Sequence, residues 1–331
     1  MKTSLWLCSL VVLVGCDSQG NVLQTDDGGA GDLSGDLSGV ADVDMAGFIG
    51  IPTADGGIVV HTDGGDVLCY ITPCQGKLYA CGNCKDDDGD GLVDSQDPDC
   101  LGPCQNNEAG FFGNIPGQNN APCKSDCYWD QDTGSGNDGC NWSHHCDPHE
   151  GDVPTATSPE ISCNYDPNAK VPGASVPGGQ KDCAYLLSNQ TTQCTNFCAP
   201  LTPNGCDCFG CCENPNAPGS FIWAGSVNAA GTPTCDAKPA TLADPTKCKA
   251  CTPVAGSCYK PCGHCQLCFG KSQLPADCYA PVDGGSTSNT DGGAPPPQTC
   301  PTDAPACGLP GQPVCAPGSY CISGCCTSVI F

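Results

Sequence analysis

The residues best suited to chemistry are the aspartates of one acidic segment, residues 85–100, which reads KDDDGDGLVDSQDPDC. Asp86, Asp88 and Asp90 occupy alternate positions, and Gly91 follows them at the point where a loop around an ion must turn sharply. Alternate carboxylates on such a loop point towards a common centre, and carboxylate oxygens are ligands that Ca²⁺ prefers. Carboxylates this close together repel one another unless a cation neutralises them. The segment therefore predicts a calcium-binding loop over residues 86–99, the alternative being a solvated acidic turn.

The same segment can be aligned with the EF-hand loop, in which Asp86 takes position 1 and Asp97 takes position 12. EF-hands use a bidentate Glu at position 12 and have flanking helices, and this sequence predicts neither. The flanking Cys84 and Cys100 instead make the segment resemble the thrombospondin type 3 calcium repeat, in which disulfides bracket Asp-rich turns and bound ions act as the core. The resemblance covers one repeat rather than a tandem array. The two comparisons together imply these ligands: Asp86, Asp88, Asp90, Asp94, Asp97 and the backbone carbonyl of Leu92.

The amino terminus predicts export and a lipid anchor. A positive start is followed by an apolar run, residues 5–14, that is too short to span a bilayer permanently. The run ends in Leu13-Val14-Gly15-Cys16, which resembles the lipobox of bacterial lipoproteins. That resemblance implies removal of residues 1–15 and acylation of Cys16 with fatty acids such as palmitate, the alternative being a plain secretory peptide. We therefore expect a lipid-anchored protein of the bacterial cell envelope, with the outer membrane or cell surface favoured. Asp17, directly after the lipidated Cys, resembles the residue that retains enteric lipoproteins in the inner membrane, so the periplasmic face of that membrane is the alternative location.

The cysteines predict the fold class. Of 331 residues, 34 are Cys, about the level that marks a disulfide scaffold. Loss of Cys8 with the signal peptide and lipidation of Cys16 leave 34 − 2 = 32, an even number that allows up to 16 bridges outside the cytoplasm. Gly and Pro, with 44 and 31 residues, interrupt nearly every candidate helix. We expect a small, disulfide-rich, mostly irregular fold of several Cys-stapled modules with few short strands and helical turns.

The chain divides by composition. Residues 17–66 contain no Cys, Lys or Arg, and such a Gly- and Asp-rich stretch predicts a disordered tether. Cys-rich sequence then runs from residue 69 to residue 278 and resumes after a second Gly- and Pro-rich linker. We expect short strands at residues 56–60, which lie within the tether, and at residues 220–223 of the Cys-rich sequence. The expected organisation is a signal peptide (1–15), the lipidated Cys with its acidic tether (16–66), a Cys-rich module with the calcium loop (67–122), two further Cys-rich modules (123–198 and 199–281), a linker (282–299) and a knottin-like six-Cys tail (300–331).

Charge excludes one class of partner. The net charge is −25, and all 11 basic residues are Lys. This balance repels phosphate backbones, and the chain has no Arg for bidentate contacts to phosphate or guanine. We expect no nucleic-acid binding; the expected partners are the membrane, through the anchor, and a protein or glycan ligand of unknown identity.

Two alternatives use other side chains. One cluster of histidines, formed by His144, His145 and His149, could bind zinc or serve a metalloenzyme, although Pro148 breaks the helix that would align them.

A second acidic stretch, residues 126–138, offers another oxygen site through Asp130, Asp132 and Asp138.

The other alternative is thiol–disulfide exchange. Cys262-Gly-His-Cys265 matches the active-site motif of protein disulfide isomerases. Together with Cys248 and Cys251, the same two cysteines also have the spacing of a zinc ribbon. No strand–helix–strand pattern surrounds the motif, and export favours disulfides over zinc. Because no catalytic constellation is complete, we expect a non-enzymatic role in binding, adhesion or structure.

Overall fold

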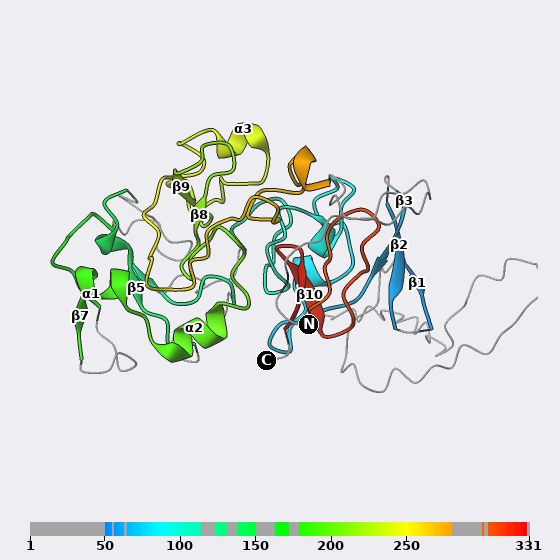
Figure 1. Ribbon diagram of the computed structural model, residues 1–331, viewed down its shortest axis with the longest axis horizontal. Coiled ribbons are helices and arrows are strands. Elements are labelled where there is room, and N and C mark those ends of the chain that lie inside the picture. Colours follow the sequence, from blue (N-terminus) through cyan, green and yellow to red (C-terminus); the bar gives the residue numbers. More distant parts are fainter. Residues whose placement is uncertain are drawn as a thin grey trace, which may run out of the picture. The chain divides into compact units, whose positions relative to one another are not determined.

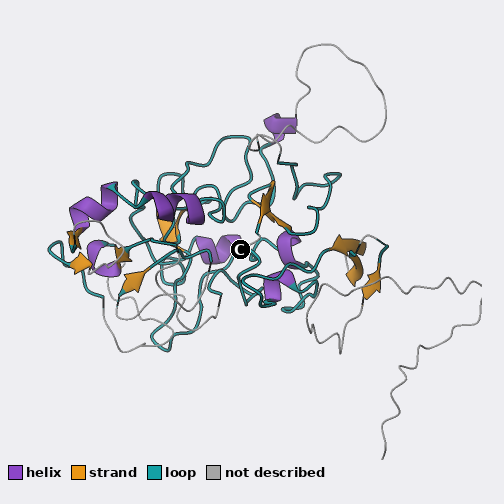
Figure 2. Ribbon diagram, turned by 90° about the horizontal axis from the view of Figure 1, so that it is seen from below, coloured by secondary structure: helices purple, strands orange, loops and turns teal. Residues whose placement is uncertain are grey.

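The computed structural model describes residues 50–54, 56–62, 65–113, 123–130, 138–149, 163–171, 179–279, 300 and 304–329. The described residues belong to one compact unit, Asp42–Phe331. Loops and turns make up most of them, as Figure 2 shows in teal, and the remaining strands and helices are short. The predicted fold class, a disulfide-rich and mostly irregular one, is confirmed. The signal peptide, the lipobox with Cys16 and the linker 282–299 lie outside the described residues.

The first ordered element is a three-stranded antiparallel sheet, in the order β1-β2-β3 (Figure 1). Ile58 pairs with Cys69 and Val60 pairs with Val67. Ile58 and Val60 are buried because alternate residues of a strand share one face, and here that face packs on Val93 of the acidic loop. The prediction of a tether up to residue 66 is therefore wrong at its end, because the sheet buries Ile58 and Val60, whereas the strand predicted at residues 56–60 corresponds to the second strand of this sheet. The strands are β1 (Gly50–Pro52), β2 (Ile58–Thr62) and β3 (Gly65–Cys69).

The other strands form four small antiparallel pairs. The strand predicted at residues 220–223 corresponds to β9. The pairs are β4 (Lys124–Ser125) with β5 (Trp142–Ser143), β6 (Lys170–Val171) with β7 (Lys181–Asp182), β8 (Cys211–Glu213) with β9 (Phe221–Trp223), and β10 (Ser319–Ile322) with β11 (Cys325–Ser328).

A side chain caps the start of each of the two longest helices, α1 and α2. The Asp182 carboxylate accepts the amide of Tyr185 at 2.9 Å, and the Thr191 hydroxyl accepts the amide of Cys194 at 3.0 Å. Each helix then ends within two turns. The described helices are α1 (Cys183–Ser188), α2 (Thr192–Cys198) and α3 (Pro239–Leu242), with 3₁₀ turns η1 (Ala80–Gly82), η2 (Asp94–Gln96), η3 (His144–Cys146) and η4 (Ala276–Tyr279).

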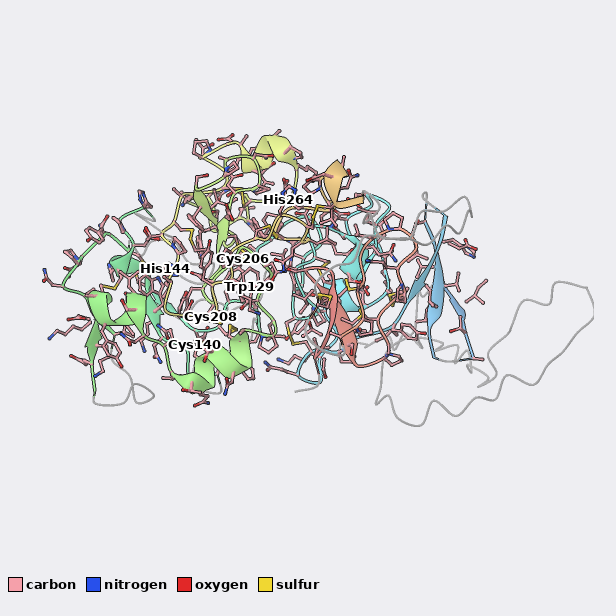
Figure 3. The ribbon with its side chains drawn as sticks, viewed as in Figure 1. Trp129, Cys140, His144, Cys206, Cys208 and His264 are labelled. Atoms are coloured by element: carbon pink, nitrogen blue, oxygen red, sulfur yellow. A yellow bond between two sulfur atoms is a disulfide. The ribbon has the colours of Figure 1, made fainter. Side chains whose placement is uncertain are left out.

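Sixteen disulfides connect these elements, and they use all 32 cysteines downstream of Cys16. Full pairing, expected from the even count, is confirmed. Figure 3 shows the bridges as yellow bonds. No bridge joins one of the following four stretches to another: 69–104, 123–198, 206–278 and 300–326.

Apolar packing, unlike the bridges, crosses from one stretch to another. The largest buried cluster combines disulfide sulfur with aromatic rings and includes Phe111, Trp129, Phe209, Phe269 and Tyr320. The rings of Trp142 and Phe209, from two different stretches, lie 6.0 Å apart between centroids. The core is therefore shared, so that the four stretches hold one another as well as themselves. None of the helices in the described ranges combines the length and apolar character needed to cross a bilayer.

Candidate metal centre

Disulfides fix both ends of the acidic loop. Cys84, before the loop, pairs with Cys69 at the end of β3, and Cys100, after it, pairs with Cys81 in η1. A simple bracket would require a bridge between Cys84 and Cys100, and the two do not pair with each other. Each end is instead tied to an upstream element, so the loop backbone is held between two fixed points.

The first half of the loop is a series of turns closed by aspartate side chains. Asp86 accepts the amides of Gly89 and Gly91, at 2.6 and 2.9 Å. The positive φ angles of these glycines, 81° and 91°, belong to the left-handed region that side chains disfavour. Asp88 and Asp90 each accept the amide two residues further on, at 3.0 and 2.9 Å. Both are exposed, and within the described chain each accepts a hydrogen bond through one oxygen only, which leaves the second oxygen available to a cation.

The second half of the loop is buried. Asp94, Asp97 and Asp99 are only 3%, 2% and 4% exposed. One oxygen of each accepts a backbone amide: from Cys84 at 3.0 Å, from Asp99 at 2.7 Å and from Ala237 at 2.5 Å, respectively. Oδ1 of Asp94 and Oδ2 of Asp97 have no hydrogen-bond partner among the described residues. Buried polar atoms nearly always have partners, so these two oxygens require an explanation.

A fourth buried acid, Glu108, was not among the ligands predicted from the sequence. It is 2% exposed, and its two oxygens accept the amides of Asp87 and Asp94 at 2.6 and 3.0 Å. Glu108 therefore joins the two halves of the loop. It lies outside the repeating pattern of acids, and nothing in its neighbourhood in the sequence distinguishes it from a solvated Glu.

Burial dominates the electrostatics of these acids. It raises the pKa of Asp97 to about 8, and the charges of Asp99, Asp90 and Glu108 add to this effect. Burial likewise raises the pKa of Glu108 to about 7 and that of Asp99 to about 7, and it raises the pKa of Asp94 well above its usual range. The charge of Asp90, in the first half of the loop, thus acts on Asp97 at the predicted twelfth position.

Little positive charge compensates this cluster. The Lys238 ammonium lies 3.5 Å from Asp236 and lowers the pKa of Asp99 from a distance. In the part of the chain that the structure describes, Asp94, Asp97 and Glu108 form no ion pair. An ionised carboxylate in such surroundings costs several kcal/mol unless a proton or a cation neutralises it.

The six predicted ligands therefore differ in what they can offer. Asp86 already accepts two amides, whereas four acids each keep one oxygen without a described partner: Asp88, Asp90, Asp94 and Asp97. The Leu92 carbonyl accepts no hydrogen bond from a described residue and is free to coordinate. Oδ2 of Asp94 accepts the Cys84 amide and lies 3.1 Å from Sγ of Cys69, which leaves Oδ1 of this carboxylate to a cation. This oxygen-rich set suits a hard cation such as Ca²⁺.

The three histidines of the predicted cluster have different surroundings and different partners. His144 is buried, hydrogen-bonds through Nε2 to Ser125 at 3.0 Å, and meets the Trp223 ring at 5.0 Å between centroids. The next residue, His145, uses Nδ1 to contact the Asn164 carbonyl at 2.6 Å, and His149 is exposed. Consecutive residues of a 3₁₀ turn point about 120° apart, which is why η3 separates the first two rings.

The cysteines of the possible redox or zinc motif are consumed by other bridges. Cys262 pairs with Cys268, and Cys265 pairs with Cys278. Cys248 and Cys251 are paired elsewhere, with Cys235 and Cys211. Zinc needs thiolates and an exchange site needs a CXXC disulfide, and this pairing supplies neither.

The second acidic stretch supports the disulfide framework. The two oxygens of Asp138 accept the amides of Cys127 and Cys140, at 2.9 and 2.6 Å. Asp132 lies outside the described residues, so the second oxygen site stays a prediction.

Comparison with known proteins adds no relative from which a role could be transferred. No family model matches the chain, and no curated protein or solved structure is significantly similar to it. The chemistry of the acidic loop is therefore the basis for assigning a function.

Proposed function

We propose that this protein is a lipid-anchored structural or adhesive component of the bacterial cell envelope whose acidic loop binds Ca²⁺. Its 16 disulfides indicate an extracytoplasmic location, because thiols persist in the reducing cytoplasm and pair outside it. Anchoring at Cys16 and a binding role towards a protein or glycan are the finer parts of the proposal. They rest on the lipobox and on the absence of a complete catalytic constellation in the sequence.

One observation carries the calcium assignment: Asp94 and Asp97 are buried, and each keeps an oxygen without a partner among the described residues. A divalent cation would neutralise these acids and would also draw on the free oxygens of Asp88 and Asp90. The resident ion would act as part of the core, because the loop has little apolar side chain to bury apart from Val93. A single extracellular site of this kind binds at about 10⁻⁴ to 10⁻³ M.

The direct test is calorimetric titration of the oxidised, metal-free protein with CaCl₂ and, separately, with MgCl₂. We expect one saturable Ca²⁺ site and weaker Mg²⁺ binding, since the loop offers more oxygens than Mg²⁺ usually takes from protein. At 10 mM CaCl₂, binding of this strength should raise the free energy of unfolding by about 1.4 to 2.7 kcal/mol.

A matched pair of variants tests the location of the site. Asp90→Asn replaces a loop acid that has an oxygen to offer, and Asp244→Asn replaces a partly exposed acid after α3 that contacts Thr246. The first should weaken Ca²⁺ binding at least tenfold, and the second should leave it unchanged. Absence of Ca²⁺ binding to the unaltered protein, or equal effects of the two substitutions, would refute the proposal.

A further inference from the structure

The C-terminal module, residues 300–329, has no disulfide to the rest of the chain. Its six cysteines pair with one another, as Cys300–Cys325, Cys307–Cys321 and Cys315–Cys326. The only covalent connection between this module and the residues before it is therefore the backbone of the linker 282–299. Whatever else holds the module in place is noncovalent.

The module docks on the second half of the acidic loop. Strand β10 packs against η2, the turn that carries Asp94. Tyr320 of β10 is 3% exposed, and it lines a small cavity together with Asp94. The Tyr320 hydroxyl, like Oδ1 of Asp94, has no hydrogen-bond partner among the described residues. The charge of Asp94 is the first of three that raise the pKa of this phenol beyond the effect of burial.

The same module lines a second cavity next to η2. This cavity has a volume of about 90 Å³, and Asp97 lines it from the loop. Cys321, Ser323 and Gly324 of the module form part of its wall. About one water fits in 10–15 Å³ of such space, so the cavity has room for an ion with part of its hydration shell.

Additional contacts hold the module against residues 199–281. The Ser323 hydroxyl accepts the amide of Asn204 at 2.7 Å. Leu309 is buried with Leu267 and Leu274. These contacts favour docking, whereas removal of water from Asp94 and Asp97 opposes it for as long as both carboxylates are charged.

We propose that cation binding at the acidic loop holds the C-terminal module in its docked position. This inference rests on the calcium site proposed above and adds its consequence. A cation neutralises the carboxylates that the module covers, which removes the main electrostatic cost of docking. Because coupling between two sites is reciprocal, docking of the module must strengthen cation binding by the same factor, about tenfold for an ordinary coupling.

The arrangement of the disulfides makes the proposal directly measurable. A protease site placed at residues 285–290 of the full chain allows the linker to be cut after oxidation, without touching a disulfide. Size-exclusion chromatography of the cut protein then reports whether the module stays bound. We expect the module to co-elute with the rest of the chain in CaCl₂. In EDTA, the fraction of the module that elutes free should be at least ten times larger.

Two asparagine variants separate the electrostatic argument from a general loss of structure. Asp97→Asn removes a buried charge and keeps an oxygen that can accept the Asp99 amide, so the cut module should stay bound even in EDTA. Asp88→Asn changes an exposed acid that lines neither cavity. It should weaken Ca²⁺ binding while release in EDTA stays as in the unaltered protein. Mass spectrometry without reduction confirms that both variants carry 16 bridges.

The outcomes distinguish this inference from the function on which it rests. If calorimetry shows Ca²⁺ binding and the cut module is retained equally in CaCl₂ and EDTA, the coupling is refuted and the calcium site stands. If the module is released equally in both, the coupling is refuted as well. If Asp97→Asn releases the module in EDTA as readily as the unaltered protein, the electrostatic explanation fails. Absence of Ca²⁺ binding refutes both proposals.

Discussion

Glu108 accepts a hydrogen bond from the backbone amide of Asp94 at 3.0 Å, although 14 residues separate the two in the sequence. The other oxygen of Glu108 holds the amide of Asp87 at 2.6 Å. One carboxylate thus connects the exposed and the buried halves of the acidic loop. Its role is to position the loop backbone, because both of its oxygens are occupied by amides.

Glu108→Gln is expected to loosen this connection. A Gln side chain can accept one of the two amides, and its own NH₂ group then faces the other donor, at a cost of about 1–3 kcal/mol. Chemical denaturation should show this loss of stability, and calorimetry should show weaker Ca²⁺ binding. Glu213→Gln is the control, since Glu213 is partly exposed and accepts only a long 3.4 Å contact from Gly219. If both substitutions change stability by less than about 0.5 kcal/mol, Glu108 does not organise the loop.

Without a cation, the buried acids should make stability depend on pH. In the folded protein the pKa of Asp97 is raised to about 8, and those of Asp99 and Glu108 are raised to about 7. The folded state therefore binds more protons than the unfolded state between about pH 4 and pH 8. Stability in EDTA should accordingly fall as pH rises through this window, and saturating CaCl₂ should flatten the dependence.

Scanning calorimetry at pH 5 and pH 8, with EDTA or CaCl₂, checks this expectation. The nearby charges of Asp90 and Asp236 act in the same direction, whereas that of Lys238 acts against it. A melting temperature that rises with pH in EDTA would contradict the assignment of buried, uncompensated carboxylates.

Lipidation at Cys16 predicts where the protein fractionates. Cys16→Ser removes the thiol that would be acylated, so the protein should leave the membrane pellet and become extractable without detergent. Cys8→Ser, within the apolar run of the signal, is the matched control and should stay in the pellet. Continued pelleting of the Cys16 variant would rule out this anchor.

Complete disulfide pairing predicts that the native protein contains no reactive thiol. Alkylation of the denatured, unreduced protein should add no mass, because all 32 cysteines downstream of Cys16 are paired. Reduction should unfold the chain, since each bridge typically contributes 2–4 kcal/mol and the aromatic core is small. Detection of two or more alkylated cysteines would revive the zinc and redox alternatives.

Local features of the loop and the overall class of the fold could be read from the sequence. Alternating Asp residues and two glycines specify the turns of residues 86–91 through contacts within six residues, and the number of cysteines was enough to predict full pairing. The strand at residues 56–60 could be expected from its own residues, but its place in a sheet could not, because Ile58 and Val60 gain their burial from Cys69 and Val93.

The partners of the loop could not be predicted in this way. Glu108 and Tyr320 contribute through tertiary contacts, and neither belongs to a local pattern. The pairing of cysteines was equally inaccessible, because neighbours such as Cys262 and Cys265 join different partners. Residue spacing limits which bridges can form, but the folded backbone decides which of them do.

The grouping of the bridges also has a consequence for biogenesis. The widest separation between paired cysteines is 71 residues, between Cys127 and Cys198, and every pair closes before the next stretch begins. During secretion from amino to carboxyl terminus, each stretch can complete its oxidation as it emerges, without waiting for a distant partner thiol. The last stretch to emerge, which covers Asp94 and Asp97, would then find an acidic surface already assembled to receive it.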